Sequence, residues 1–219
     1  MLENTFRAVN IALVNELKII FDRLGINIWD VIAASATKPF GFMPFYPGPG
    51  WGGHCIPVDP FYLSYLARRH GCRARFIELA GTINTVMPQY VVTKTEQALA
   101  TRGTTLRGAR ILILGLSYKK DIGDPRESPA FPLIELLEQA GAQVSYSDPF
   151  IPRMPRMRRF TTDDRCSVTV APGTLAAYDA VIIVTNHAAF NYPMILRHAR
   201  LIVDTRNVYP GSHPKVIKA

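Results

Sequence analysis

Short runs of apolar residues recur at wide intervals through the second half of the chain. They are ARILILGL (109–116), AQVSYSD (142–148), DAVIIVTN (179–186) and RLIVDT (200–205), and the stretches between them, such as Ser128 to Ala140, are long enough for helices. Nearly continuous apolar strands are typical of a parallel sheet that is buried on both faces, and the intervening helices provide the cover. The alternation therefore predicts an α/β domain with a parallel sheet covered by helices on both faces.

The first half of the chain has a different texture, with apolar residues three and four positions apart. This period indicates amphipathic helices, and glycine and proline mark where they stop. We predict helices over 4–24, 28–36, 61–70 and 75–102, the last one bent or restarted near Pro88. The segment TRGTTLRGA (101–109) then indicates a boundary. We expect a helical region over 1–103 and the α/β domain over 104–219.

One long segment between two predicted helices, TKPFGFMPFYPGPGWGGHCIPVDP (37–60), is interrupted repeatedly by proline and glycine and cannot sustain regular structure. A loop of this length inside a compact domain is usually functional. It contains Cys55, preceded by Gly52 and Gly53, which permit close backbone approach to a ligand. A thiol there suits a nucleophile that meets a bulky substrate, although an arbitrary cysteine is more often a buried structural residue.

The charge of the chain is strongly basic, with a formal net charge of +8 and a pI of about 9.6. This balance fits a polyanionic partner, for which nucleic acid and a small molecule with a diphosphate are the first two candidates. The densest basic run, Arg153 to Arg165, contains Met, Pro and Asp and has no ladder of aromatic residues. We therefore favour a solvated loop over a nucleic-acid site in this run.

The cysteines and the lengths of the apolar runs indicate the cellular environment of the chain. Cys55, Cys72 and Cys166 lie far apart without CxxC spacing, which predicts free thiols and neither a disulfide framework nor a metal site. The chain has no run of roughly 18 apolar residues and no basic segment leading into an apolar one at its N-terminus. We accordingly expect no membrane span and no secretory signal, and a cytoplasmic location.

Five segments resemble one enzyme family, the nucleotide-sugar 6-dehydrogenases, and most closely the branch that acts on UDP-N-acetylglucosamine. They are ENTFRAVNIALVNEL, ATKPFGFMPFYPGPGWGGHCIPVDPFYL, RFIELAGTIN, ILGLSYKKDIGDPRESPA and VDTRNVY, in the family's order and spread over nearly the whole chain. The resemblance implies a central helical dimerisation region followed by a UDP-binding Rossmann-like domain. The family also has an N-terminal domain that binds NAD, and the matching segments begin after it, so we expect this chain alone not to reduce NAD.

The resemblance also implies catalytic roles. Cys55 matches the family nucleophile, whose thiolate adds to a C6 aldehyde and carries the thiohemiacetal and thioester to the uronate. Asn4 matches an asparagine that binds the oxyanion or the catalytic water, and Asp59 a carboxylate that orients water. For Asn4 and Asp59 a helix cap is the alternative reading. A family lysine four residues before Asn4 falls before Met1.

The remaining implied contacts concern the nucleotide-sugar. Arg7 lies one helical turn after Asn4, and Gly52 is placed for backbone approach to substrate. Tyr118, Lys119 and Arg206 follow predicted strands, where ligands of parallel sheets bind, and the resemblance assigns them to the UDP-sugar. It assigns Arg126 to NAD, the family cofactor, while the absence of a GxGxxG sequence argues against an independent dinucleotide site. Val58 stands where UDP-glucose enzymes commonly carry lysine, which favours an N-acetylhexosamine substrate.

Two other functions are weighed against the dehydrogenase. The chain could be a non-catalytic UDP-sugar-binding or dimerisation module, which would keep the nucleotide contacts without the thiol chemistry. A nucleic-acid-binding protein rests on net charge alone. We expect a homodimer formed through the central helices, and neither nucleic acid nor a membrane as partner.

Overall fold

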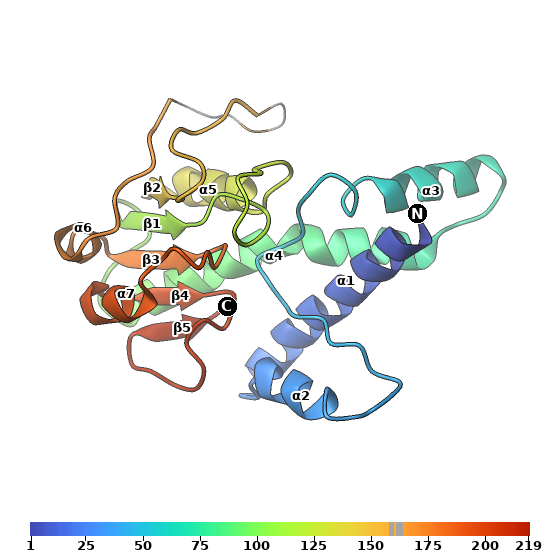
Figure 1. The fold of residues 1–219 in the computed structure, drawn as a ribbon, viewed down its shortest axis with the longest axis horizontal. Coiled ribbons are helices and arrows are strands. Elements are labelled where there is room, and N and C mark those ends of the chain that lie inside the picture. Colours follow the sequence, from blue (N-terminus) through green and yellow to red (C-terminus); the bar gives the residue numbers. More distant parts are fainter. Residues whose placement is uncertain (158–159, 161–163) are drawn as a thin grey trace. The chain divides into compact units, whose positions relative to one another are not determined.

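The computed structural model describes residues 1–157, 160 and 164–219, and these form two compact units, Met1–Met87 and Pro88–Ala219 (Figure 1). The division falls inside one long helix, α4 (Arg75–Ala100). It lies upstream of the limit at residues 103 and 104 that the sequence suggests, because the second half of α4 packs into the core of the second unit. No helix in the described ranges is both long and apolar enough to cross a membrane.

The first unit is helical, as predicted. It contains α1 (Leu2–Arg23), α2 (Ile28–Ser35), α3 (Asp59–Arg69) and the first half of α4. The side chain of Asn27 caps α2 by accepting a hydrogen bond from the backbone N–H of Trp29 at 3.2 Å. Pro88 lies within one continuous helix, so the predicted restart there does not occur. The residues on both sides of Pro88 are held by packing, since Met87, Val91 and Val92 are buried.

The second unit is built on a five-stranded parallel sheet, which confirms the predicted fold class. Its strands are β1 (Arg110–Leu114), β2 (Gln143–Ser147), β3 (Ala180–Ile183), β4 (Ile202–Asp204) and β5 (Val216–Lys218). They lie in the order β2-β1-β3-β4-β5, and every neighbouring pair is parallel (Figure 1). The short β5 was not predicted, because only one of its three residues is fully buried.

Helices cover both faces of the sheet, and alternate residues of each strand point to different cores. Ile111 and Ile113 of β1 pack with α5 (Ala130–Gln139) and with the end of α4. Leu112 and Leu114 pack on the opposite face with α6 (Pro172–Ala176) and α7 (Tyr192–His198). This alternation follows from the period of two in a strand. It leaves the carboxyl ends of the strands as the edge where irregular segments gather.

Two local features of the second unit refine the sequence predictions. Helix α5 begins at Ala130, two residues after Ser128, where the expected helical stretch starts. The Ser128 hydroxyl still accepts a hydrogen bond from the Ala130 N–H at 3.2 Å. In the basic run, Arg165 forms an ion pair with Glu138 at 2.7 Å. The backbone of Arg153 forms an isolated antiparallel β-bridge with that of Cys166. Residues 158, 159 and 161–163 of this run lie outside the described residues.

Gly115, directly after β1, allows the closest backbone approach in this unit. Its φ is +88°, and a Cβ atom there would lie 2.4 Å from the carbonyl oxygen of Thr185. Gly108 has a similar φ of +80° but no atom within 4 Å of such a Cβ. A side chain at Gly108 would therefore meet only backbone strain, whereas one at Gly115 would meet backbone strain and steric overlap.

We predict that Gly115→Ala destabilises the chain more than Gly108→Ala does. Both variants introduce the left-handed strain of about 1–2 kcal/mol. Gly115→Ala adds an overlap with backbone, which typically costs a further ~1–3 kcal/mol. Urea unfolding followed by far-UV circular dichroism measures both, and equal losses would show that the two backbones approach less closely than described.

Candidate functional site

Two of the predicted catalytic residues, Asn4 and Asp59, are brought together from positions far apart in the sequence. The Asn4 Nδ2 donates a hydrogen bond of 2.8 Å to Asp59 Oδ2, and both residues are half-buried. Neither side chain caps its helix, because Met1 precedes α1 and Val58 precedes α3 without a side-chain cap bond. The bond joins the first turns of two helices and fixes an amide next to a carboxylate.

Cys55 is held next to this pair by the start of α3. Its carbonyl oxygen accepts hydrogen bonds from the N–H groups of Val58, at 3.1 Å, and Asp59, at 2.8 Å. The cysteine is exposed, which removes the alternative of a buried structural residue, and its Sγ lies 3.9 Å from Nδ1 of His54. The thiol and imidazole are thus linked to the Asn4–Asp59 pair through the backbone bond from Asp59 to Cys55.

The loop that leads to Cys55 is anchored by two buried asparagines that sequence reasoning missed. The Asn15 Nδ2 donates to Asn84 Oδ1 at 2.7 Å, and Asn15 Oδ1 accepts from the N–H of Gly48 at 2.9 Å. The Asn84 Nδ2 donates to the Ala80 carbonyl at 2.9 Å. Buried amides are costly unless they are paired. Their placement on the apolar faces of α1 and α4 is the signal that could have identified them.

Two predicted arginines have acidic partners close by in the sequence. Arg7 contacts Glu3, one turn earlier in α1, at 2.5 Å. Arg126 contacts Asp124 at 2.6 Å and is largely exposed. Gly52 lies half-buried in the loop before Cys55.

In the second unit, Arg206 lies two residues after Asp204, which ends β4. Its Nε donates to the carbonyl oxygen of Val184 at 2.7 Å, which ties it to the segment after β3. Burial lowers the pKa of the Arg206 guanidinium to about 10, against the opposing charge of Asp204, so Arg206 remains a cation at neutral pH. The Asp204 carboxylate accepts from Lys218 Nζ at 2.9 Å.

The turn after β1, which contains Tyr118 and Lys119, is organised by a buried carboxylate that the sequence did not reveal. Asp148, at the end of β2, accepts hydrogen bonds at Oδ2 from the N–H of Leu116, at 2.6 Å, and of Ser117, at 3.0 Å. The same oxygen lies 3.1 Å from Nε2 of His187, which is fully buried. Burial alone would raise the pKa of Asp148, but the bonds from His187 and from backbone N–H groups lower it.

This turn does not fit the pyrophosphate of a dinucleotide. In a dinucleotide-binding domain the N–H groups after the first strand face the phosphates. Here the Asp148 carboxylate accepts from those N–H groups on Leu116 and Ser117. NAD therefore has no cradle at the end of β1, in agreement with the absence of a GxGxxG sequence there.

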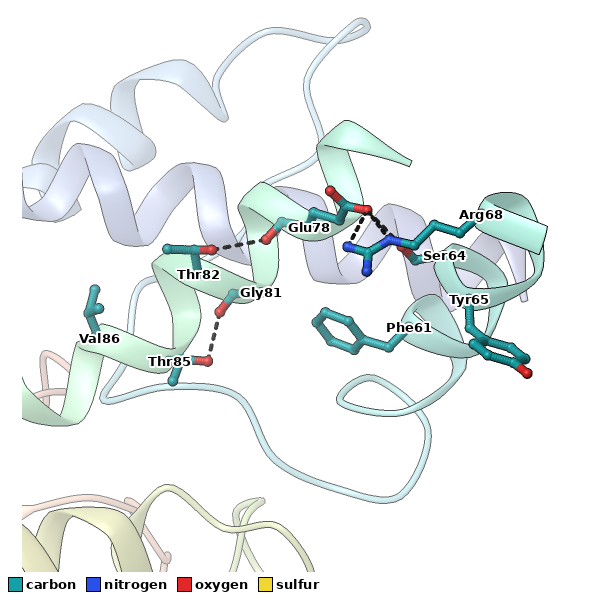
Figure 2. A pocket seen from close by; sticks show the side chains of 9 residues that line it. All are labelled: Phe61, Ser64, Tyr65, Arg68, Glu78, Gly81, Thr82, Thr85 and Val86. Carbon is teal, nitrogen blue, oxygen red and sulfur yellow. Dashed lines mark hydrogen bonds and ion pairs between the residues drawn. The ribbon is translucent and has the colours of Figure 1, made fainter. Parts of the chain in front are cut away.

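A separate cleft lies between α3 and α4 in the first unit, with a volume of about 640 Å³ (Figure 2). Phe61 rests on α4 at Gly81, where a Cβ would lie 2.5 Å from the phenyl ring, and Arg68 contacts Glu78 at 2.8 Å. None of the predicted site residues is among those that line it, namely Phe61, Ser64, Tyr65, Arg68, Glu78, Gly81, Thr82, Thr85 and Val86.

Two family models match most of the chain. Residues 1–86 match the central domain of the UDP-glucose/GDP-mannose dehydrogenase family, and residues 112–211 match its UDP-binding domain. The chain belongs to this family. Its two matched segments follow one another in the same order as the two units of the structure.

Individual relatives support this assignment. The chain is 36% identical over 87% of its length to a UDP-N-acetyl-D-glucosamine 6-dehydrogenase of Pseudomonas aeruginosa, covering 43% of that protein. It is 33% identical over 94% of its length to a UDP-N-acetyl-D-mannosamine dehydrogenase of Salmonella typhi, covering 49% of it. A UDP-D-ManNAc dehydrogenase structure from Pyrococcus horikoshii aligns with 99% of the chain and 49% of its own length, with a TM-score of 0.83 and 30% identity. The chain thus spans about half the length of the relatives it matches.

We predict that Cys55 is the most reactive of the three thiols. All three cysteines are exposed, so accessibility does not separate them, but Cys55 has an imidazole nitrogen 3.9 Å away that can accept the thiol proton. Brief iodoacetamide labelling followed by mass-spectrometric mapping gives the order of modification. His54→Gln should slow the labelling of Cys55 and leave Cys72 unchanged, and earlier labelling of Cys72 or Cys166 would contradict the prediction.

Proposed function

We propose that this chain provides the thiol-bearing and UDP-binding parts of an NAD-dependent dehydrogenase that oxidises the C6 alcohol of a UDP-N-acetylhexosamine to a carboxylate. The observation that carries the proposal is the bond between Asn4 and Asp59, whose backbone N–H binds the carbonyl of the exposed Cys55, within a chain of this family. The names of several relatives, which act on N-acetylglucosamine and N-acetylmannosamine derivatives, support the substrate class.

In this proposal Cys55 acts as the nucleophile. Its thiolate forms a bond from Sγ to C6 of the aldehyde that the first oxidation produces, and the carbonyl oxygen takes the negative charge. A second two-electron oxidation gives the thioester, and water then releases the carboxylate and returns the thiol. NAD is the proposed oxidant of both steps. Covalent attachment to Cys55 keeps the aldehyde from leaving between them.

Asn4 and Asp59 have complementary roles in the same proposal. The Asn4 amide has a second N–H besides the one that Asp59 accepts, so it can donate to the oxyanion or to the attacking water. The carboxylate of Asp59 orients the amide and can accept a proton from water during thioester hydrolysis. Arg7 and Gly52 are proposed to contact the sugar, and Arg126 to reach toward NAD.

The UDP moiety is proposed to bind at the carboxyl edge of the sheet in the second unit. Tyr118 and Lys119 lie in the turn after β1, and Arg206 lies after β4. Arg206 is a cation in a partly desolvated position, which strengthens a hydrogen bond to phosphate.

We predict that the chain binds UDP and that Lys119→Ala and Arg206→Ala weaken the binding. Each charge-assisted contact with phosphate contributes roughly 1.5–3 kcal/mol, so each Kd should rise at least about tenfold. Isothermal titration calorimetry measures this. Arg197→Ala, which removes an exposed positive charge in the last turn of α7, is the matched control and should leave Kd unchanged. An unaltered affinity in Arg206→Ala would remove this residue from the site.

A second copy of the chain is the partner that we propose for the first unit. Exposed apolar side chains recur along α1 at seven-residue intervals, at Phe6, Leu13 and Ile20. Helix α4 exposes Phe76, which is 77% accessible, together with Leu79 and Val86. Apolar stripes with this spacing are typical of helices that pack against another helix.

We predict that the chain is a dimer at micromolar concentration and that Leu79→Arg converts it to a monomer, because the variant places a charge within the apolar stripe of α4. Size-exclusion chromatography with light scattering gives the mass. The control is Ala34→Arg, which adds the same charge at an exposed position of α2, away from the apolar stripes of α1 and α4. A monomeric parent chain would rule out the proposed dimer.

A further inference from the structure

His187 lies between Asp148, which follows β2, and Asp121, in the turn after β1, and contacts both. It is fully buried, follows β3, and lies among the rings of Phe150 and Phe190 at centroid distances of 5.1 and 5.8 Å. On one side its Nε2 lies 3.1 Å from Asp148 Oδ2. On the other side its Nδ1 accepts a hydrogen bond of 2.9 Å from the backbone N–H of Asp121.

These two contacts fix which nitrogen of the imidazole carries the proton. A backbone N–H can only donate, so Nδ1 of His187 must be the acceptor for Asp121. The proton then lies on Nε2 and is donated to the carboxylate of Asp148. The imidazole therefore connects a buried carboxylate to the backbone of the turn that follows β1.

The turn has a left-handed backbone conformation at Asp121, and contacts from the segment after β3 hold this residue. Asp121 has a φ of +59°, in the left-handed region that residues other than glycine rarely occupy. Its N–H is bound by His187, and its Oδ1 accepts a hydrogen bond of 2.7 Å from the N–H of Ala188. Both contacts come from the segment after β3, so the position of the turn is set from the neighbouring strand.

We propose that His187 is a positioning residue for nucleotide binding, which holds the turn of residues 117–124 so that Tyr118 and Lys119 face the UDP moiety. The inference rests on the proposed function. It assigns no contact with substrate to His187 itself. The imidazole acts through Asp121, and Asp148 acts by fixing the tautomer that leaves Nδ1 free to accept.

Two substitutions of His187 each retain one of the two hydrogen bonds of the imidazole and remove the other. In His187→Asn the amide oxygen can take the place of Nδ1, which retains the acceptor for Asp121 and loses the donor to Asp148. In His187→Gln the amide nitrogen can take the place of Nε2, which retains the donor and loses the acceptor. A role in core stability alone would weaken UDP binding in both variants in proportion to their loss of stability. A positioning role makes binding depend on the acceptor.

The experiment measures UDP affinity by calorimetry, stability by urea unfolding, and hydrogen exchange of the peptide that covers residues 117–124. Leu175→Ala, a buried position in α6 that does not contact the turn, provides a variant destabilised for an unrelated reason. We expect His187→Gln to expose the Asp121 amide to exchange and to raise the Kd for UDP about tenfold, as it would if the competent turn were populated a tenth of the time. His187→Asn and Leu175→Ala should stay within about twofold of the parent Kd.

Equal UDP affinities for His187→Gln and His187→Asn would overturn the inference, as would unchanged exchange in His187→Gln. Failure of the parent chain to bind UDP would instead overturn the proposed function, and with it the nucleotide part of this inference. The exchange rates would still decide whether His187 holds the turn, because they require no ligand.

Discussion

The parallel sheet imposes the constraint on which the second unit depends. All of its strands end at the same edge, so the segments after them converge there, and their backbone N–H and C=O groups have no strand to pair with. Two aspartates accept hydrogen bonds from backbone N–H groups of these segments. Asp148 accepts from the turns after β1 and β2, and Asp204 accepts from the segment after β4. The residues proposed to bind UDP lie next to these two carboxylates.

In the first unit, buried side-chain amides, and not carboxylates, anchor the backbone of an irregular segment. Its long loop has few backbone partners of its own, and the bond from Gly48 to Asn15 ties it to the helices. Asn15 is in turn paired with Asn84, so three separate segments meet at two buried side chains. Beyond this anchor the loop reaches Cys55, whose carbonyl oxygen is bound by N–H groups at the start of α3. The thiol can therefore be exposed while the backbone around it is fixed at both ends.

Most of the fold could be predicted from the sequence because it depends on periodicity. The period of apolar residues identified the helices of the first unit, and the apolar runs identified four of the five strands. The resemblance to a family placed Asn4, Asp59 and Cys55, and the structure brings Asn4 and Asp59 into contact. The pairing of Asp148 with His187 was not predicted, because the two residues are 39 positions apart. The sequence around each of them does not distinguish a buried ionisable pair from two loop residues. Likewise, β5 has too few buried residues for a pattern to form.

The carboxylate of Asp148 has a consequence for the chain without ligands. In a domain that binds a dinucleotide through the turn after its first strand, the N–H groups of that turn are left to water whenever the cofactor departs. Here the chain supplies its own anion to Leu116 and Ser117, and that anion is covalently attached to β2. The N–H groups of Leu116 and Ser117 therefore have an acceptor without any ligand. Nucleotide binding at this edge, as proposed, would then require little ordering of the backbone, and its entropy cost would be correspondingly small.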